Sequence, residues 1–212
     1  MDRCQSLTSA YHAMSVAVIN YDYDMVRWEP DSRGRLAQAA MELYSEQGFE
    51  KTTVAEIAER AGLTERTFFR HFADKREVLF AGAGEFQDLL VGSVASAPDS
   101  LAPIDAAAEG ALAAAAMLQQ RAEFARQRAK VIAANPELQE RELIKFASLS
   151  AALADTLRAR GATEPAASLT AEVAMAVFRT AFERWIDEPD GPDFPQLIRE
   201  SLEELTALTT SR

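Results

Sequence analysis

Cysteine, histidine and long apolar runs are nearly absent from this sequence of 212 residues. Its single cysteine, Cys4, leaves no intrachain disulfide, which fits a reducing compartment. Its two histidines, His12 and His71, occur without a Glu-x-x-His pattern, so zinc and di-iron sites lack ligands and serine or cysteine catalysis lacks its base. No apolar run approaches the roughly 18 residues of a membrane-spanning helix. We therefore expect a cytoplasmic protein that is no enzyme, uses no cofactor and no metal, and has no membrane partner.

An overall excess of basic residues is also missing. The formal net charge is −11, which taken alone argues against a nucleic-acid partner. The acidity is uneven, because residues 33–76 carry eight Lys and Arg against seven Asp and Glu, a net charge of +1, and the rest of the chain carries −12. A docked polyanion responds mainly to charges within a Debye length, about 8 Å at physiological salt. A local basic face in this segment therefore remains compatible with DNA binding.

Alternating β-branched runs are absent, and glycine and proline are sparse inside the long periodic segments, so the fold is predicted to be all-α. The loop SAPDSLAP at 96–103 separates two of the expected helices. Apolar periodicity and capping residues predict about nine helices, at residues 32–47, 53–61, 65–72, 74–94, 104–118, 119–134, 136–160, 164–188 and 194–208.

Two short helices joined by a tight turn occupy residues 53–72. Thr53 and Glu56 have the spacing of a capping box, in which the threonine hydroxyl accepts the Glu56 amide and the carboxylate reaches back. A glycine-containing turn follows, and Thr64 is placed as the N-cap of the next helix. Because a further helix precedes them, the two short helices have the layout of a helix-turn-helix motif.

The helix at 65–72 has two different faces. At about 100° per residue, Phe68 and Phe72 fall on one side and anchor the helix to a core. The remaining surface carries side chains suited to phosphates, base edges and thymine methyl groups in a major groove, namely Arg66, Thr67, Phe69, Arg70 and His71. Thr53 and Thr64 lie at helix starts where phosphate can bind, and Lys75 can reach the flanking DNA backbone. The alternative is a solvated helix whose Phe69 is half-buried against the first helix.

Residues 36–80, LAQAAMELYSEQGFEKTTVAEIAERAGLTERTFFRHFADKREVLF, resemble the DNA-binding domain of TetR-family transcriptional regulators. The shared pattern includes Thr-Thr-Val-x-x-Ile-Ala-x-x-Ala-Gly-Leu, a recognition helix ending in Phe-Arg-His-Phe, and an Asp-Lys start to the following helix. Many family members carry tyrosine where Phe69 stands, so one phosphate hydrogen bond is missing here. The resemblance implies DNA contacts from Thr53, Thr64, Glu65, Arg66, Thr67, Phe69, Arg70, His71 and Lys75.

One short recognition helix makes too few contacts for tight specific binding, so a homodimer on two half-sites is expected. The helix at 164–188 is apolar on two sides, which predicts burial against both its own core and a symmetry mate. The family resemblance implies a four-helix interface that the last helix completes. The alternative is a single larger monomeric bundle. The predicted interface residues are Val173, Val177, Phe182, Ile198, Leu202 and Leu205.

Helices between about residues 104 and 160 are expected to enclose a ligand pocket. The candidate lining residues, each of which can also be plain core, are Met117, Phe124, Phe146, Leu149 and Phe178. A basic cluster around Phe124, formed by Arg121, Arg126, Arg128 and Lys130, is either a solvated face or the partner of an anionic head group. Residues 178–185 resemble actinobacterial mycofactocin-repressor-type regulators, and that resemblance implies an effector of the acyl-CoA type.

These observations divide the chain into a leader (1–30), a TetR-type helix-turn-helix domain (31–78) and a C-terminal ligand-binding and dimerisation domain (79–212). The leader is either a disordered tail or a wrongly assigned start. The chain is expected to be a repressor that binds a palindromic operator in double-stranded DNA as a dimer and is released by a small-molecule effector, apolar or acyl-CoA-like. Effector binding would move helix 74–94 and so change the separation of the two recognition helices. The alternative is a helical apolar-ligand carrier or protein-interaction bundle without DNA binding.

Overall fold

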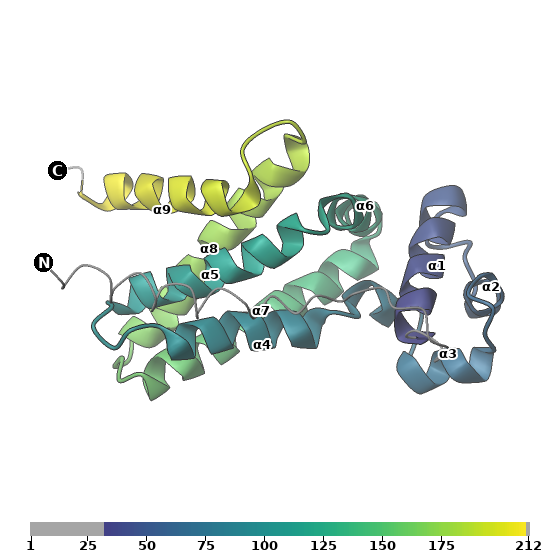
Figure 1. The fold of residues 1–212 in the computed structure, drawn as a ribbon, viewed down its shortest axis with the longest axis horizontal. Coiled ribbons are helices and arrows are strands. Elements are labelled where there is room, and N and C mark those ends of the chain that lie inside the picture. Colours follow the sequence, from purple (N-terminus) through teal and green to yellow (C-terminus); the bar gives the residue numbers. More distant parts are fainter. Residues whose placement is uncertain (1–31, 211–212) are drawn as a thin grey trace, which may run out of the picture. The chain divides into compact units, whose positions relative to one another are not determined.

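The computed structural model describes residues 32–210, and the expectation for the leader lies outside these residues. All regular elements in the described part are helices, as the periodicity predicts (Figure 1). Most helix ends fall within a few residues of the predicted ones. The elements are α1 (Ser32–Gln47), α2 (Val54–Arg60), α3 (Glu65–His71), a short 3-10 helix η1 (Glu77–Phe80), α4 (Ala83–Ser96), α5 (Pro103–Gln119), α6 (Ala122–Ala133), α7 (Pro136–Ala159), α8 (Ala166–Asp187) and α9 (Phe194–Thr210).

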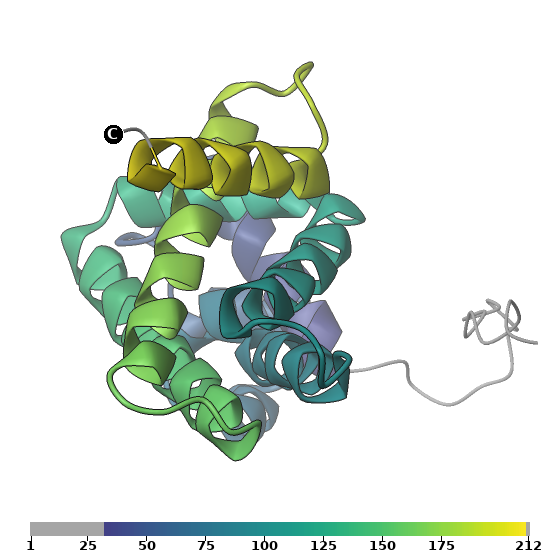
Figure 2. The same ribbon diagram turned by 90° about the vertical axis from the view of Figure 1, so that its left-hand side faces the viewer.

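Two hydrophobic cores hold the described residues together. We call α1, α2, α3 and η1 the head, whose core includes Leu36, Ile57 and Phe68. We call α4 to α9 the body, whose core is built mainly from α4, α5, α7, α8 and α9 (Figures 1 and 2). Helix α6 serves both cores, because its Ala125 packs in the body core while its Val131 packs in the head core. The head therefore rests on α6 as well as on its own helices.

The segment between the head and α4 differs from the single long helix predicted at 74–94. Asp74 caps a short 3-10 turn instead, since its carboxylate accepts the backbone N–H groups of Arg76 at 2.8 Å and Glu77 at 3.1 Å. The chain then turns at residues 81–82 before α4 begins. Gly82 occupies the N-cap position of α4, and Gly84 follows two residues later. Glycine is a poor helix former, so this pair favours a break in the helix. The prediction of one continuous helix was wrong for this reason.

Helices α4 and α5 approach each other closely, and both are drawn in teal in Figure 2. The contact is centred on Gly110 of α5, which is buried. A Cβ atom added to Gly110 would lie 2.6 Å from Val94 Cγ2 and 2.8 Å from the Leu90 carbonyl oxygen. Only glycine allows the two backbones to come this near. Alanines at positions 106, 107, 111, 114 and 115 continue the small, buried face of α5.

The stretch Glu77–Ser96 has the length and apolar composition of a membrane-crossing helix. In the structure it is interrupted by the turn at residues 81–82. Two of its residues, Leu90 and Val94, belong to the body core. We therefore assign this stretch no membrane role.

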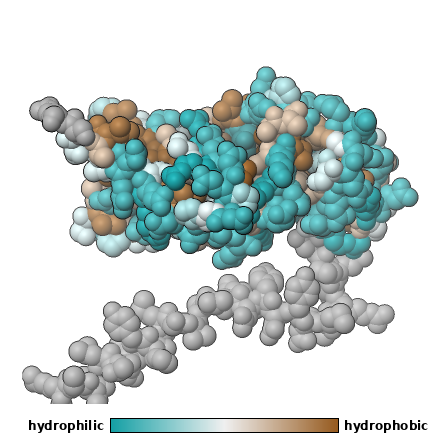
Figure 3. All heavy atoms as spheres, turned by 90° about the horizontal axis from the view of Figure 1, so that it is seen from above, coloured by the Kyte–Doolittle hydropathy of each residue, from teal (hydrophilic) through white to brown (hydrophobic). Residues whose placement is uncertain are grey.

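Aromatic rings join α8 to α9 in the body. The rings of Trp185 and Phe194 stack with centroids 4.9 Å apart, and the Phe178 ring lies 5.1 Å from that of Phe194. Trp185 is nearly fully buried although it is the largest side chain type, so this contact fixes the start of α9 on α8. The surface seen from above in Figure 3 is mostly hydrophilic, with separate hydrophobic patches between the charged side chains.

Candidate nucleic-acid interface

The two short helices of the head begin at threonine caps, as predicted. The Thr53 hydroxyl accepts the Glu56 backbone N–H at 3.2 Å, and the Glu56 carboxylate accepts the Thr53 backbone N–H at 2.8 Å, which is a complete capping box. These hydrogen bonds from Thr53 hold the pKa of the Glu56 carboxyl below its usual range. Gly62, with φ at +64°, turns the chain toward Thr64, whose hydroxyl caps α3 by accepting the Thr67 backbone N–H.

Helix α3 is anchored by one face, and its other residues point away from the core. Phe68 is 0% exposed and Phe72 is buried, with their ring centroids 5.6 Å apart. Phe69 is 56% exposed, although its ring makes an edge contact with Phe68. Arg66 and Arg70 are exposed, as are Glu65 and Thr64, whereas Thr67 is partly buried. The expected division into an anchoring face and an outward face is therefore present, and Phe69 is among the most exposed large apolar side chains of the described residues.

The cations of the head divide into those with partners and those without. Arg60 pairs with Glu46 at 2.8 Å, and Arg76 pairs with Asp74 at 2.7 Å. Arg33 donates to the Ala81 carbonyl oxygen at 2.5 Å, and Arg35 donates to the carbonyl of Ala61 at the end of α2. In the described part of the head, the lysines and arginines left without a carboxylate or carbonyl partner are Lys51, Arg66 and Arg70. Two of these three lie on the outward face of α3.

Lys75, for which a phosphate contact was expected, makes several contacts within the head. Its ammonium group donates to the carbonyl oxygens of Phe49 at 2.8 Å, Glu50 at 3.1 Å and Thr52 at 3.1 Å. The same group lies 4.4 Å from the centroid of the Phe49 ring. An ammonium has three protons, and here each has an internal acceptor. Lys75 is therefore a clamp on the turn between α1 and α2, a role that side-chain type and position did not reveal.

His71 is also engaged within the head. Its Nε2 atom lies 2.9 Å from the Ser32 hydroxyl oxygen and 3.5 Å from an Arg70 guanidinium nitrogen. The residue is partly buried at the last turn of α3. These contacts tie α3 to the first residue of α1, so His71 positions the recognition helix as well as bordering its outward face.

Three polar contacts connect the head to the body through η1. Arg128 of α6 donates to the Leu79 carbonyl oxygen at 2.7 Å and pairs with Glu142 of α7 at 2.9 Å. Glu77 of η1 pairs with Arg141 of α7, and Lys145 lies 3.7 Å from the same carboxylate. Arg128 was predicted only as part of a basic cluster. Its long-range partner could not be read from the sequence because the two residues lie far apart along the chain.

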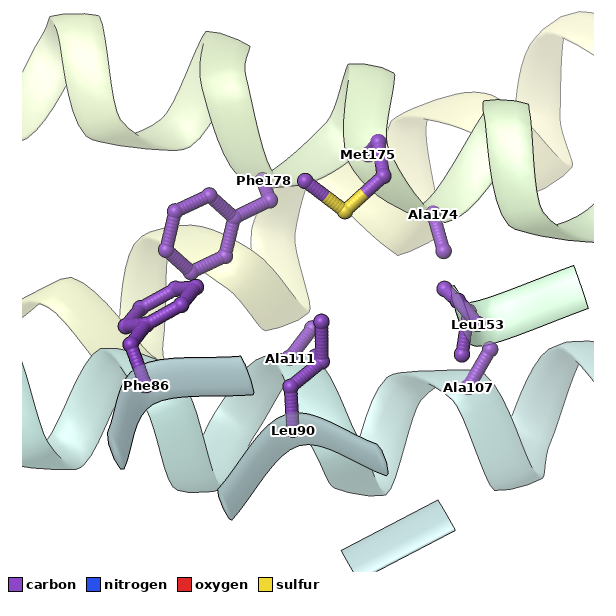
Figure 4. A pocket seen from close by; sticks show the side chains of 8 residues that line it. All are labelled: Phe86, Leu90, Ala107, Ala111, Leu153, Ala174, Met175 and Phe178. Carbon is purple, nitrogen blue, oxygen red and sulfur yellow. The ribbon is translucent and has the colours of Figure 1, made fainter. Parts of the chain in front are cut away.

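An apolar pocket lies in the body between α4, α5, α7 and α8. The space between its lining side chains, which Figure 4 shows, has no room for a water molecule. Phe178 lines it, as predicted, whereas Phe146 and Leu149 pack against the body core, Phe124 packs against the head core, and Met117 is half-buried outside the lining. Helical periodicity identifies an apolar face but not the neighbour that it meets, so the sequence did not show where these four residues pack. The lining residues are Phe86, Leu90, Ala107, Ala111, Leu153, Ala174, Met175 and Phe178.

The predicted dimer residues divide by burial within the protomer. Ile198 is 0% exposed and Val177 is also buried, so both pack in the protomer's own core and offer no surface to a partner. Both belong to the apolar core in which α8 packs on α5, α7 and α9. Val173, Phe182, Leu202 and Leu205 are partly buried. On α8 and α9, the large apolar side chains that lie open are Leu169 and Leu208, at 61% and 73% exposure.

Related proteins share both parts of this architecture. Residues 36–81 match the bacterial regulatory proteins of the tetR family, and residues 101–210 match the MftR C-terminal domain. The regulator TcmR of Streptomyces glaucescens is 37% identical over 75 residues, covering 35% of this chain and 33% of TcmR, so the chain spans about a third of that relative. The mycofactocin biosynthesis regulator MftR of Mycobacterium tuberculosis is 25% identical over 154 residues, covering 71% of this chain and 78% of MftR.

Solved structures show the same fold. The complex of SmeT with triclosan has a TM-score of 0.59 at 20% identity and covers 82% of this chain and 90% of that one. Thermus thermophilus FadR, a repressor in complex with lauroyl-CoA, has a TM-score of 0.54 at 21% identity and covers 84% and 96%. Because the C-terminal match alone spans more than half of the chain and the head carries an anchored recognition helix with free outward cations, this protein belongs to the TetR family of DNA-binding transcriptional regulators, with an MftR-like C-terminal domain, and is not an enzyme.

Proposed function

We propose that this regulator is a cytoplasmic repressor that binds a palindromic operator as a homodimer and is released by a small-molecule effector. The observation that carries the DNA part is the outward face of α3, where Arg66 and Arg70 lie exposed and form no ion pair with any acid of residues 32–210. Unpaired guanidinium groups on a rigid helix suit bidentate contacts with guanine and with phosphate. The family resemblance adds that such helices enter the major groove.

The proposed DNA contacts are seven of the nine residues expected from the sequence. Glu65, Arg66 and Phe69 face outward from the first turns of α3, where base edges come within reach. Arg70 lies in its last turn, beside the sugar-phosphate backbone. His71 and Lys75 act instead by positioning, through Ser32 and through the turn between α1 and α2. The full set of proposed contacts is Thr53, Thr64, Glu65, Arg66, Thr67, Phe69 and Arg70.

The dimer is proposed to form through α8 and α9, as the family implies. Their open apolar residues, Leu169 and Leu208, together with the partly buried Val173, Leu202 and Leu205, are the surface that a second copy would cover. Two recognition helices related by a two-fold axis would then meet half-sites about 34–36 Å apart. Light scattering of the purified chain should give the mass of a dimer, and Leu169→Glu should shift it toward a monomer.

The effector is proposed to be apolar or acyl-CoA-like and to enter the body between α4, α5, α7 and α8. The lining there is entirely apolar, and it includes Met175 and Phe86, side chains that can change rotamer to make room. Two relatives of the same fold hold such molecules, lauroyl-CoA in one and triclosan in the other. An effector that binds a conformation with an enlarged pocket better than the conformation described here would shift the protein toward the enlarged one.

Gel retardation of palindromes from the gene's own upstream region tests the proposal. We expect the wild-type protein to retard one palindrome at low salt and Arg66→Ala with Arg70→Ala not to retard it. Lauroyl-CoA and triclosan, added separately as probes, should release the complex if the effector class is right. Release by neither would remove the proposed effector class while leaving DNA binding intact. Retardation of no palindrome would contradict the proposal of a repressor with a palindromic operator.

A further inference from the structure

The turn between α1 and α2 presents one lysine that has no partner in the structure. Lys51 is exposed, and it makes no hydrogen bond or ion pair with any described residue. The nearest acid in sequence, Glu50, is exposed beside it, and Glu46 is already paired with Arg60. Lys51 is therefore, with Arg66 and Arg70, one of the three cations in the described part of the head without a carboxylate or carbonyl partner, and the expected contact residues do not include it.

The residues on both sides of Lys51 are held firmly. Phe49 is buried, with its ring 5.2 Å from that of Tyr44, and Thr52 is buried, with its hydroxyl donating to the Gly48 carbonyl oxygen at 2.8 Å. Lys75 then draws together the carbonyls of Phe49, Glu50 and Thr52 around its ammonium group. The backbone of Lys51 is thus fixed from both sides while its side chain projects freely. A cation on such a turn loses little backbone entropy when it binds an anion.

The same clamp places the turn beside the end of the recognition helix. Lys75 follows Phe72, the C-cap of α3, by three residues, and its backbone carbonyl accepts the Tyr44 hydroxyl at 2.7 Å. Burial raises the pKa of Tyr44, with the charge of Asp74 acting in the same direction, so this donor stays protonated. The turn that carries Lys51 is therefore tied to the end of α3 where Arg70 lies.

We propose that Lys51 binds a backbone phosphate of the DNA on the strand that borders the groove entered by α3, and that Lys75 positions it. When a recognition helix lies in the major groove, loops beside it meet the sugar-phosphate backbone, as the loop between the first two helices does in homeodomains. Contacts of this kind fix the orientation of the protein without reading sequence. Lys51 thus supplies the charge that Lys75, fully occupied inside the head, does not.

Salt dependence of binding to a random-sequence duplex measures this contact directly. Each phosphate neutralised contributes about 0.9 to the slope of log K against log salt concentration. We expect Lys51→Ala to lower the slope by about 0.9 for each protomer bound, and Lys51→Arg to retain the wild-type slope. Fluorescence anisotropy with a duplex long enough for two half-sites gives the slope for the full-length protein. The matched control is Arg121→Ala, which removes an equally exposed cation from the start of α6 in the body.

Two results would overturn the proposal. The first is a wild-type slope for Lys51→Ala, which would mean that the side chain meets no phosphate. The second is an equal loss for Arg121→Ala, which would mean that only the net charge of the protein matters. Urea unfolding of Lys51→Ala should coincide with the wild type, because the side chain has no internal partner, and this separates a lost contact from a damaged fold. The measurement uses no operator and no effector, so it stands apart from the proposal of a ligand-released repressor.

Discussion

The Arg128 guanidinium donates from Nε to the Leu79 carbonyl oxygen at 2.7 Å, and this bond joins α6 of the body to η1 of the head. The same guanidinium pairs with Glu142 and lies 5.0 Å from the centroid of the Phe80 ring. Hydrogen bonds from a charged group contribute about 1.5–3 kcal/mol each in measured series. Since these contacts converge on one side chain, Arg128 links η1 of the head to both α6 and α7 of the body.

Replacement of Arg128 by alanine should therefore loosen η1 more than the rest of the protein. We expect faster amide hydrogen exchange in η1 and at the start of α1, with a local loss of about 2 kcal/mol, while the exchange of α8 stays unchanged. Arg121→Ala is the control, because that arginine is exposed at the other end of α6. Uniform acceleration throughout the chain would show instead that Arg128 supports global stability only.

Lys75→Ala should destabilise the head, in contrast to Lys51→Ala. Removal of the ammonium leaves the carbonyls of Phe49, Glu50 and Thr52 without their shared donor, and the buried Thr52 cannot turn its carbonyl to water easily. We expect a loss of about 2 kcal/mol in the free energy of unfolding, measured by urea titration. A Lys75 variant as stable as the wild type, with a reduced salt slope, would restore the phosphate role first expected for it.

Gly110→Ala should force α4 away from α5. The new methyl group would lie 2.6 Å from Val94 Cγ2 and 2.8 Å from a backbone oxygen, and the backbone cannot yield cheaply. Overpacking of this kind costs about 1–3 kcal/mol, which thermal unfolding would register as a lower Tm. Gly92→Ala in α4 is the matched control, since its methyl group would meet nothing within 4 Å. That change should stabilise the protein by up to about 1 kcal/mol, as alanine is the better helix former.

The capping carboxylate of Glu56 should make the stability of the head depend on acid pH. Its pKa is lower in the folded protein than in the unfolded chain, so its charge adds stability above the unfolded value of 4.5, and this stability is lost as the pH falls through the folded value. Glu56→Gln keeps a capping side chain but has no charge to lose. We expect the difference between wild type and Glu56→Gln in urea unfolding to be largest near neutral pH and to shrink below the unfolded pKa. A constant difference would exclude a contribution from the charge.

Arg66→Ala should change which sequences are bound as well as how tightly. A bidentate contact with one base pair contributes about 1–3 kcal/mol of discrimination, so selection from a random duplex pool should lose its preference at one position in each half-site. Lys51→Ala should weaken all selected sequences alike. If the two variants gave the same selected sequence, the division between base-reading and phosphate-binding residues would be incorrect.

The all-α fold, most helix ends and both threonine caps could be predicted from the sequence because they depend on local signals. Thr53 and Glu56 lie three residues apart, and Phe68 and Phe72 share one side of a single helix turn, so spacing alone identifies them. Helical periodicity predicted the outward face of α3 as well, and the family resemblance added the DNA contacts implied for it. The two rings and the free arginines are where that pattern places them.

The remaining features depend on contacts between distant parts of the chain. Lys75 reaches carbonyls more than twenty residues away, and Arg128 reaches Leu79 across forty-nine positions, distances at which periodicity carries no signal. The same limit applies to Ile198, whose burial in the protomer's own core the apolar pattern did not show. The break at Gly82 carries a local signal, a pair of glycines, which the neighbouring apolar residues outweighed in the prediction.

The contribution of α6 and α7 to the head core has a consequence for dissecting the protein. Val131, Ile132 and Leu138 close the side of the head that α1 and η1 leave open, although they are encoded some fifty residues downstream. A fragment that stops after Phe80 would expose that apolar side to water, so it should aggregate or remain only partly folded when expressed alone. In a chimera, the DNA specificity of this regulator can be transplanted only together with the end of α6 and the first turns of α7.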